Sequence, residues 1–120
     1  MILLHGTTRA RAERIRQRGP DPAYQEPGGQ EPAGGFSMNV AAGPFLFGHP
    51  EDYARNKARS YPEEGGPVIL AVDVPDEVVS LAVNDWFPLS QGLVQFDPGA
   101  GLEELIAVWP TLAVAIRSVP

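Results

Sequence analysis

The chain has 120 residues, of which 43% are hydrophobic and 20% are charged, proportions typical of one ordinary globular domain. The formal net charge of -6 argues against broad electrostatic binding to nucleic acid, and the absence of cysteine excludes disulfides and thiolate metal sites. No apolar run approaches the ~20 residues of a membrane span, and no secretory signal is recognisable, so we expect a soluble, cytoplasmic protein.

The N-terminus predicts an apolar strand that passes through His5-Gly6-Thr7-Thr8 into a helix. Thr7 or Thr8 can cap this helix, because a hydroxyl at the N-cap accepts a hydrogen bond from a backbone N–H of the first turn. Gly19 stands where the helix should end. A His-Gly-Thr sequence beside a helix N-terminus is a suitable place for a small polar ligand. A capped turn with no ligand explains the same residues equally well.

The predicted first helix is rich in arginine. Five of the nine basic residues lie between Arg9 and Arg18. One interpretation is a solvated helix face. The other is a local positive field that attracts a phosphate-bearing ligand or an acidic partner.

Residues 20–44 contain ten glycines and prolines and predict a long loop. We interpret this loop as a lid or binding loop, because long loops within a domain are usually functional. Phe36 and Met38 are its only large apolar side chains.

The rest of the chain predicts alternating strands and helices. Val68–Val74 is the strongest strand, and we expect it to be central because both of its faces are apolar. Asp76–Val83 fits a short helix or a strand. Trp86 and Phe87 are expected in the core or lining a pocket. The other predicted elements are a buried strand at Phe45–Phe47, a helix from Pro50 to Tyr61 with a Glu51–Arg55 pair, and strands at Leu93–Phe96, Glu104–Trp109 and Val114–Val119. With no repeats and no second core, residues 1–120 form a single domain.

Three blocks of the sequence, in this order, resemble the ADP-ribosyltransferase superfamily, especially its diphtheria-toxin-like and poly(ADP-ribose) polymerase-like branch. That branch is known by an H-Y-E pattern. The matching residues are Leu3-Leu4-His5-Gly6-Thr7, then Gly43 to Phe47 followed by Asp52-Tyr53-Ala54, and finally Glu104-Leu105-Ile106-Ala107-Val108. The resemblance implies an α+β fold with split mixed or antiparallel β-sheets and two flanking helices. The family's RNA 2′-phosphotransferase branch also opens with His-Gly-Thr, but its further basic and histidine motifs are not evident here.

The resemblance implies that NAD+ is the substrate and that no metal takes part. By match, His5 hydrogen-bonds the adenosine ribose, the Gly6 backbone holds the nicotinamide amide, and Thr7 supports them. Glu104 is the catalytic residue, since a carboxylate stabilises the positive charge that develops on the ribose as the glycosidic bond breaks. Glu103 is the second choice, and an exposed acidic pair without function is the alternative for both.

The chain departs from the family pattern at Phe45, where a tyrosine is expected. The aromatic ring, which can stack on nicotinamide, is kept, while the hydroxyl is lost. Tyr53 or Tyr24 is the candidate for a second aromatic wall.

The leading hypothesis is therefore an ADP-ribosyltransferase that modifies an unknown protein or nucleic-acid acceptor or hydrolyses NAD+, as a toxin or a regulator. The alternative is a non-catalytic module that binds NAD+, ADP-ribose or a protein. A third hypothesis is a scaffold that uses the arginine-rich helix for contact. His49, before the second predicted helix, is expected at the surface or as its cap. No spacing of His, Asp and Glu predicts a metal site.

Overall fold

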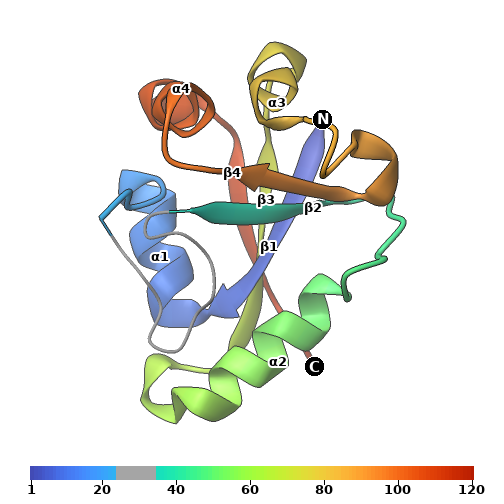
Figure 1. Ribbon diagram of the computed structural model, residues 1–120. Coiled ribbons are helices and arrows are strands. Elements are labelled where there is room, and N and C mark those ends of the chain that lie inside the picture. The colour runs from blue at the N-terminus through green and yellow to red at the C-terminus, as the bar shows by residue number, and fades with distance from the viewer. Residues whose placement is uncertain (24–34) are drawn as a thin grey trace.

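The computed structural model describes residues 1–23 and 35–120. Among them, five strands form an antiparallel sheet in the order β4-β2-β1-β3-β5 (Figure 1). The strands are β1 (Ile2–Thr8), β2 (Phe36–Val40), β3 (Pro67–Asp73), β4 (Leu93–Phe96) and β5 (Val114–Ser118). The helices are α1 (Arg9–Arg18), α2 (Pro50–Ser60), α3 (Asp76–Ala82) and α4 (Ala100–Val108), with short 3-10 turns η1 (Pro62–Glu64), η2 (Leu89–Gln91) and η3 (Trp109–Thr111).

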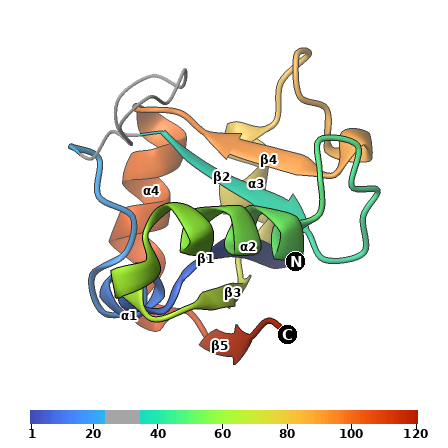
Figure 2. The same cartoon turned by 90° about the horizontal axis from the view of Figure 1, so that it is seen from below.

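The helices cover the two faces of the sheet unequally. Leu3, Leu70 and Val72 share the larger core with residues of α1, α3 and α4, and we call this side the three-helix face. Leu4 and Ile69 point the opposite way and pack with Ala54 of α2, and we call this side the α2 face. The division follows from strand geometry, because successive side chains point to opposite faces. Figure 2 shows α2 lying along β1 and β3.

The α+β class expected from the sequence is confirmed. β3 is central, between β1 and β5, and its alternating side chains are buried on both faces, as Val68–Val74 predicted. The predicted strands at residues 93–96 and 114–119 and the first two helices are also present. The described residues hold four α-helices, however, where two flanking helices were expected.

The strand predicted at Glu104–Trp109 is wrong, because these residues belong to α4 and η3. The apolar residues of this segment fit the repeat of a helix as well as that of a strand. As a helix, Leu102, Leu105 and Trp109 fall on one side, and all three are almost fully buried. The strand interpretation would have buried one of the adjacent glutamates, whereas the helix turns both to solvent. Burial of the apolar stripe therefore decides the structure.

The predicted loop of residues 20–44 is wrong where β2 forms. Phe36–Val40 alternates apolar and polar side chains, which is the pattern of a strand, and β2 pairs with both β1 and β4. The glycines and prolines around it conceal this short pattern. Residues 24–34 of the predicted loop, including Tyr24, lie outside the described residues.

Residues 45–47 do not form the predicted buried strand. They belong to the turn-rich segment between β2 and α2, where Leu46 and Phe47 are exposed. Asp76–Ala82, which fitted two structures, is helical. Trp86 is 85% exposed, so its expected place in the core or in a pocket is also wrong.

Candidate functional site

The junction between β1 and α1 has the predicted form. β1 runs through His5 and Gly6 and ends at Thr8, which is the N-cap of α1: its Oγ1 accepts a hydrogen bond from the Arg11 N–H, 3.4 Å away. Gly19 ends the helix with a positive φ of 79°, and its N–H bonds the Ile15 carbonyl. The sequence thus places a histidine on a central strand beside a capped helix N-terminus.

His5 is half-buried between β1 and β2. Its Nδ1 lies 2.8 Å from the Ser37 carbonyl oxygen, and its ring lies 4.4 Å from the Phe36 ring between centroids. Because a carbonyl oxygen only accepts, Nδ1 donates this hydrogen bond. The Ser37 carbonyl thus fixes the orientation of the imidazole.

Gly6 lies where the pairing of β1 and β2 ends. The two strands pair at Leu3–Val40 and Leu4–Asn39, while β1 continues to pair with β3. The Ile2 carbonyl accepts a hydrogen bond from the Ala41 N–H, on the β2 side of β1. Because the backbone groups of successive residues alternate between the two sides of a strand, the N–H and C=O of Gly6 also face the β2 side. These backbone groups thus point toward β2 beyond the last paired residues.

Gly6 also has a packing role that is independent of any ligand. A Cβ at this position would lie 2.0 Å from the Pro50 carbonyl oxygen and 3.0 Å from the Ala54 nitrogen. Only glycine lets α2 approach β1 this closely. The identity of this residue is therefore explained by the fold alone.

The two threonines after Gly6 are buried structural residues. Thr7 is 1% exposed and lies opposite Val68 on β3. Thr8 is fully buried, and besides capping α1 it donates a hydrogen bond of 2.8 Å to Glu64 Oε1. The predicted role of Thr7 beside a ligand stays a prediction, and its burial makes a packing role sufficient.

Two of the five arginines of α1, Arg9 and Arg11, contact neighbouring elements. Arg11 is buried, its Nε lies 2.6 Å from Glu64 Oε1, and its guanidinium stacks 4.2 Å from the Tyr61 ring centroid. The Arg11 hydrogen bond holds the pKa of Glu64 below its ordinary value, against the opposing effect of burial. Arg9 donates to Ser118 Oγ. These contacts fasten α1 to η1 and β5, in keeping with a structural role.

A row of polar side chains crosses β2 and β4 on the α2 face. The Ser37 hydroxyl donates to Gln95 Oε1, and Gln95 Nε2 donates to Asp97 Oδ1 over 3.2 Å. Ser37 lies opposite Gln95 in the strand pairing, and Asn39 lies two residues along on the same face. Gln95 and Asn39 are 4% and 5% exposed. The sheet therefore carries a buried polar strip whose one carboxylate, Asp97, is exposed.

This polar row was missed by the sequence interpretation. Its signal is the alternation of Phe36-Ser37-Met38-Asn39 and of Val94-Gln95-Phe96, which places the polar members of both strands on one face. The aromatic residue beside His5 is Phe36, which the sequence suggested only as a loop anchor. In η2, before β4, the Oε1 atom of Gln91 is buried and has no hydrogen-bond partner among the described residues.

Phe45 lies in the segment between β2 and α2 rather than on a strand. Its ring contacts His49, with 4.4 Å between centroids. Tyr53, the other described candidate for an aromatic wall, donates its hydroxyl to the Phe47 carbonyl. Tyr24 lies outside the described residues. The aromatic groups of the second block therefore lie at the start of α2.

Glu103 and Glu104 are exposed on α4. α4 packs on α3 through its apolar side and belongs to the three-helix face. The His5 side chain lies on this face too, because it alternates with Leu3 along β1, and it contacts Phe36 of β2. The three blocks thus come from β1, from the start of α2 and from α4, and the carboxylate that hydrogen-bonds Gln95 of β4 is Asp97 rather than Glu104.

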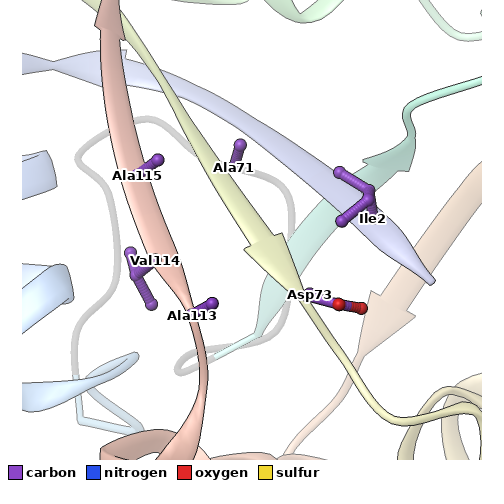
Figure 3. A pocket seen from close by; sticks show the side chains of 6 residues that line it. All are labelled: Ile2, Ala71, Asp73, Ala113, Val114 and Ala115. Atoms are coloured by element: carbon purple, nitrogen blue, oxygen red, sulfur yellow. The ribbon is translucent and has the colours of Figure 1, made fainter.

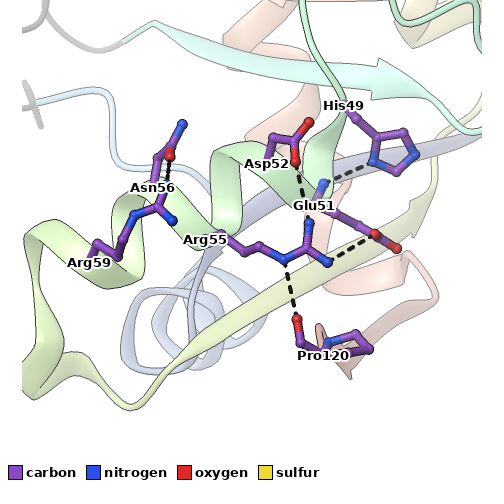
Figure 4. A network of polar contacts seen from close by, with 7 residues as sticks. All are labelled: His49, Glu51, Asp52, Arg55, Asn56, Arg59 and Pro120. Atoms are coloured by element: carbon purple, nitrogen blue, oxygen red, sulfur yellow. Dashed lines mark hydrogen bonds and ion pairs between the residues drawn. The ribbon is translucent and has the colours of Figure 1, made fainter.

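The first turns of α2 hold a polar network that also reaches the end of the chain (Figure 4). His49 caps the helix through Nδ1, which accepts from the Glu51 N–H, so the capping alternative is confirmed. Arg55 pairs with Glu51, as predicted, and with Asp52, and it donates to the Pro120 carbonyl. This network stabilises α2 and needs no ligand.

A shallow hollow lies on the α2 face near the start of β1 (Figure 3). Its walls are mostly small apolar side chains, with one carboxylate; they are Ile2, Ala71, Asp73, Ala113, Val114 and Ala115. None of the site residues predicted from the sequence lines it. Within residues 1–23 and 35–120, no group of three or more metal-binding side chains is clustered, and no helix is long and apolar enough to cross a membrane.

The fold is thus an α+β sheet with three helices on one face and one on the other. Neither a scan against protein-family models nor searches of curated proteins and of solved structures found a match.

Proposed function

We propose that this chain binds NAD+ at an ADP-ribosyltransferase-like site centred on His5 and Gly6. The observation that supports it best is the position of these residues on β1, where its pairing with β2 ends. The His5 imidazole is held by the Ser37 carbonyl, and Gly6 directs its N–H and C=O toward the β2 side. A fixed hydrogen-bonding ring beside a backbone donor–acceptor pair suits a ribose and a carboxamide.

The buried polar strip, with Ser37 on β2 and Gln95 on β4, lies on the α2 face of the sheet. The His5 ring lies on the opposite, three-helix face, so the strip does not belong to this site. Phe45 supplies an aromatic ring at the start of α2, and this ring would stack on the nicotinamide.

Transfer of ADP-ribose breaks the bond between nicotinamide and its ribose, and the electron pair leaves with nicotinamide. The ribose carbon that becomes positive then takes the acceptor's oxygen or nitrogen, or water. A carboxylate beside the ribose would stabilise that charge. Glu104 is the residue suggested by the family resemblance, with Glu103 as its neighbour.

A non-catalytic NAD+- or ADP-ribose-binding module is the second candidate. The exposed position of Glu104 on α4 favours it, because a catalytic carboxylate must touch the reacting ribose and is usually partly desolvated. The loss of the tyrosine hydroxyl at Phe45 favours it too.

Calorimetric titration with NAD+, followed by a nicotinamide assay of the same sample, tests both candidates. We expect saturable binding that weakens by about tenfold or more in His5→Asn, because the imidazole ring that would bond the ribose is lost. A urea unfolding curve of the variant shows whether its fold is intact. Absence of binding by the wild-type chain would contradict both candidates.

The nicotinamide assay assigns the carboxylate. Release that stops in Glu104→Gln and persists in the matched variant Glu103→Gln would establish transfer or hydrolysis with Glu104 as the catalytic residue. Binding without release would establish the non-catalytic module.

A further inference from the structure

Large apolar side chains gather at the surface where two loops meet the start of α2. Trp86 is 85% exposed, Leu46 66%, Phe47 45% and Tyr53 41%. The two loops touch, since the rings of Phe47 and Phe87 meet edge to face at 5.9 Å. We call Leu46, Phe47, Tyr53, Trp86 and Phe87 together the aromatic surface. Figure 2 shows both segments, between β2 and α2 and between α3 and β4, at the side of the sheet away from α4.

Hydrogen bonds hold this surface in its exposed form. Asn84 Oδ1 accepts from the backbone N–H groups of Trp86, at 2.9 Å, and of Phe87, at 3.0 Å. This Asx-type turn fixes the backbone that presents the indole to solvent. On the other loop, the Tyr53 hydroxyl donates to the Phe47 carbonyl. The exposure is therefore built into the turns, and rigid exposed aromatic side chains are the usual anchors of protein interfaces.

The two loops that form the aromatic surface carry charge of one sign. Residues 41–49 contain no Asp, Glu, Lys or Arg, and the one such residue in 83–92 is Asp85. Asp85 is exposed and directly precedes Trp86. The whole chain also has a formal net charge of -6. These charges favour a positively charged partner over nucleic acid or anionic lipid.

We propose that the aromatic surface docks a positively charged segment of a protein partner, one that carries arginine or lysine next to apolar residues. A guanidinium or ammonium group stacks on the indole face of Trp86 while pairing with Asp85, an arrangement in which the ring and the carboxylate both favour the cation. The apolar residues of the segment cover Phe47 and Leu46. The surface lies outside the His5 region, and the inference does not depend on NAD+ binding.

Selection from a phage-displayed library of random peptides on the immobilised full chain tests this inference. We expect enriched peptides to combine arginine or lysine with leucine or an aromatic residue. A synthetic peptide of the enriched sequence is then titrated while tryptophan emission is recorded. Trp86 is exposed and Trp109 is buried, with its Nε1 bonded to the Arg16 carbonyl, so a blue shift on binding reports Trp86.

Calorimetry should show that Trp86→Ala weakens peptide binding by about tenfold or more, as expected for an interface anchor. Asp85→Lys should weaken it similarly, whereas the same charge reversal at Glu103 on α4 should leave it nearly unchanged. Each variant is compared with the wild type in urea unfolding. Enrichment of acidic or uncharged peptides, no enrichment, binding that persists in Trp86→Ala, or self-association of the chain through this surface would overturn the inference.

Discussion

Replacing Gly6 with alanine is expected to lower the free energy of unfolding by about 3 kcal/mol or more. The added Cβ would lie 2.0 Å from the Pro50 carbonyl oxygen. That neighbour is backbone within the first turn of α2, so the helix itself must move away from β1. The shift would open the core that Leu4 and Ile69 share with Ala54. Urea unfolding followed by circular dichroism measures the loss.

Gly101→Ala is the matched control for this substitution. Gly101 lies in α4, and a Cβ there meets the Leu81 carbonyl oxygen at 3.4 Å, its carbon at 3.5 Å and the Ala82 nitrogen at 3.7 Å, all ordinary contact distances. Alanine should leave stability unchanged or raise it by up to about 1 kcal/mol, because it favours the helix more than glycine does. A Gly6→Ala variant as stable as the wild type would mean that α2 does not pack this closely on β1.

Replacing Glu64 with glutamine is expected to lower the free energy of unfolding by about 2 kcal/mol at neutral pH. The change removes the charge that faces Arg11, whose side chain is only 10% exposed and lies 2.6 Å from the Glu64 carboxylate. It also weakens the hydrogen bond that Thr8 donates. The Arg11 guanidinium would then remain largely buried without the negative charge of Glu64.

The same pair makes stability depend on pH. The Arg11 hydrogen bond lowers the pKa of Glu64 in the folded chain below its ordinary value of 4.5. A depressed carboxyl pKa gives stability that is fully present above the ordinary value and is lost as the pH falls through the folded value. Wild-type stability should therefore fall on acidification more steeply than that of Glu64→Gln. Urea midpoints at neutral pH and at about pH 3 measure the difference.

Two further variants separate the ion pair from general charge effects. Glu63 is an exposed carboxylate on the same turn, and Glu63→Gln should retain the wild-type pH response. The double variant Arg11→Met with Glu64→Leu should recover most of the stability, because apolar residues of similar size avoid the desolvation of two charges. An identical acid response in the wild type and in Glu64→Gln would contradict the role assigned to this pair.

The sequence alone determined those helices and strands whose local sequence signals predict the same structure as the burial of their apolar side chains. The capped junction from Thr8 into α1, the start of α2 at Pro50 and the doubly apolar β3 follow from N-cap chemistry, the fixed φ of proline and alternation, all of which act within a few residues. His5 on a strand before a helix was predictable for the same reason. The shared face of Ser37 and Gln95 could also have been found, once β2 was recognised from its alternation.

Tertiary structure decided what local patterns leave open. Leu102, Leu105 and Trp109 fit a helical stripe, while Leu105, Ala107 and Trp109 fit a strand, and only the available core selects α4. That choice moves Glu104 from a strand to an exposed helix position. The need for glycine at position 6 arises because α2 lies against β1, a contact between segments more than 40 residues apart that no local signal reports. Trp86 is exposed because Asn84 fixes its turn, although hydrophobicity alone predicts burial.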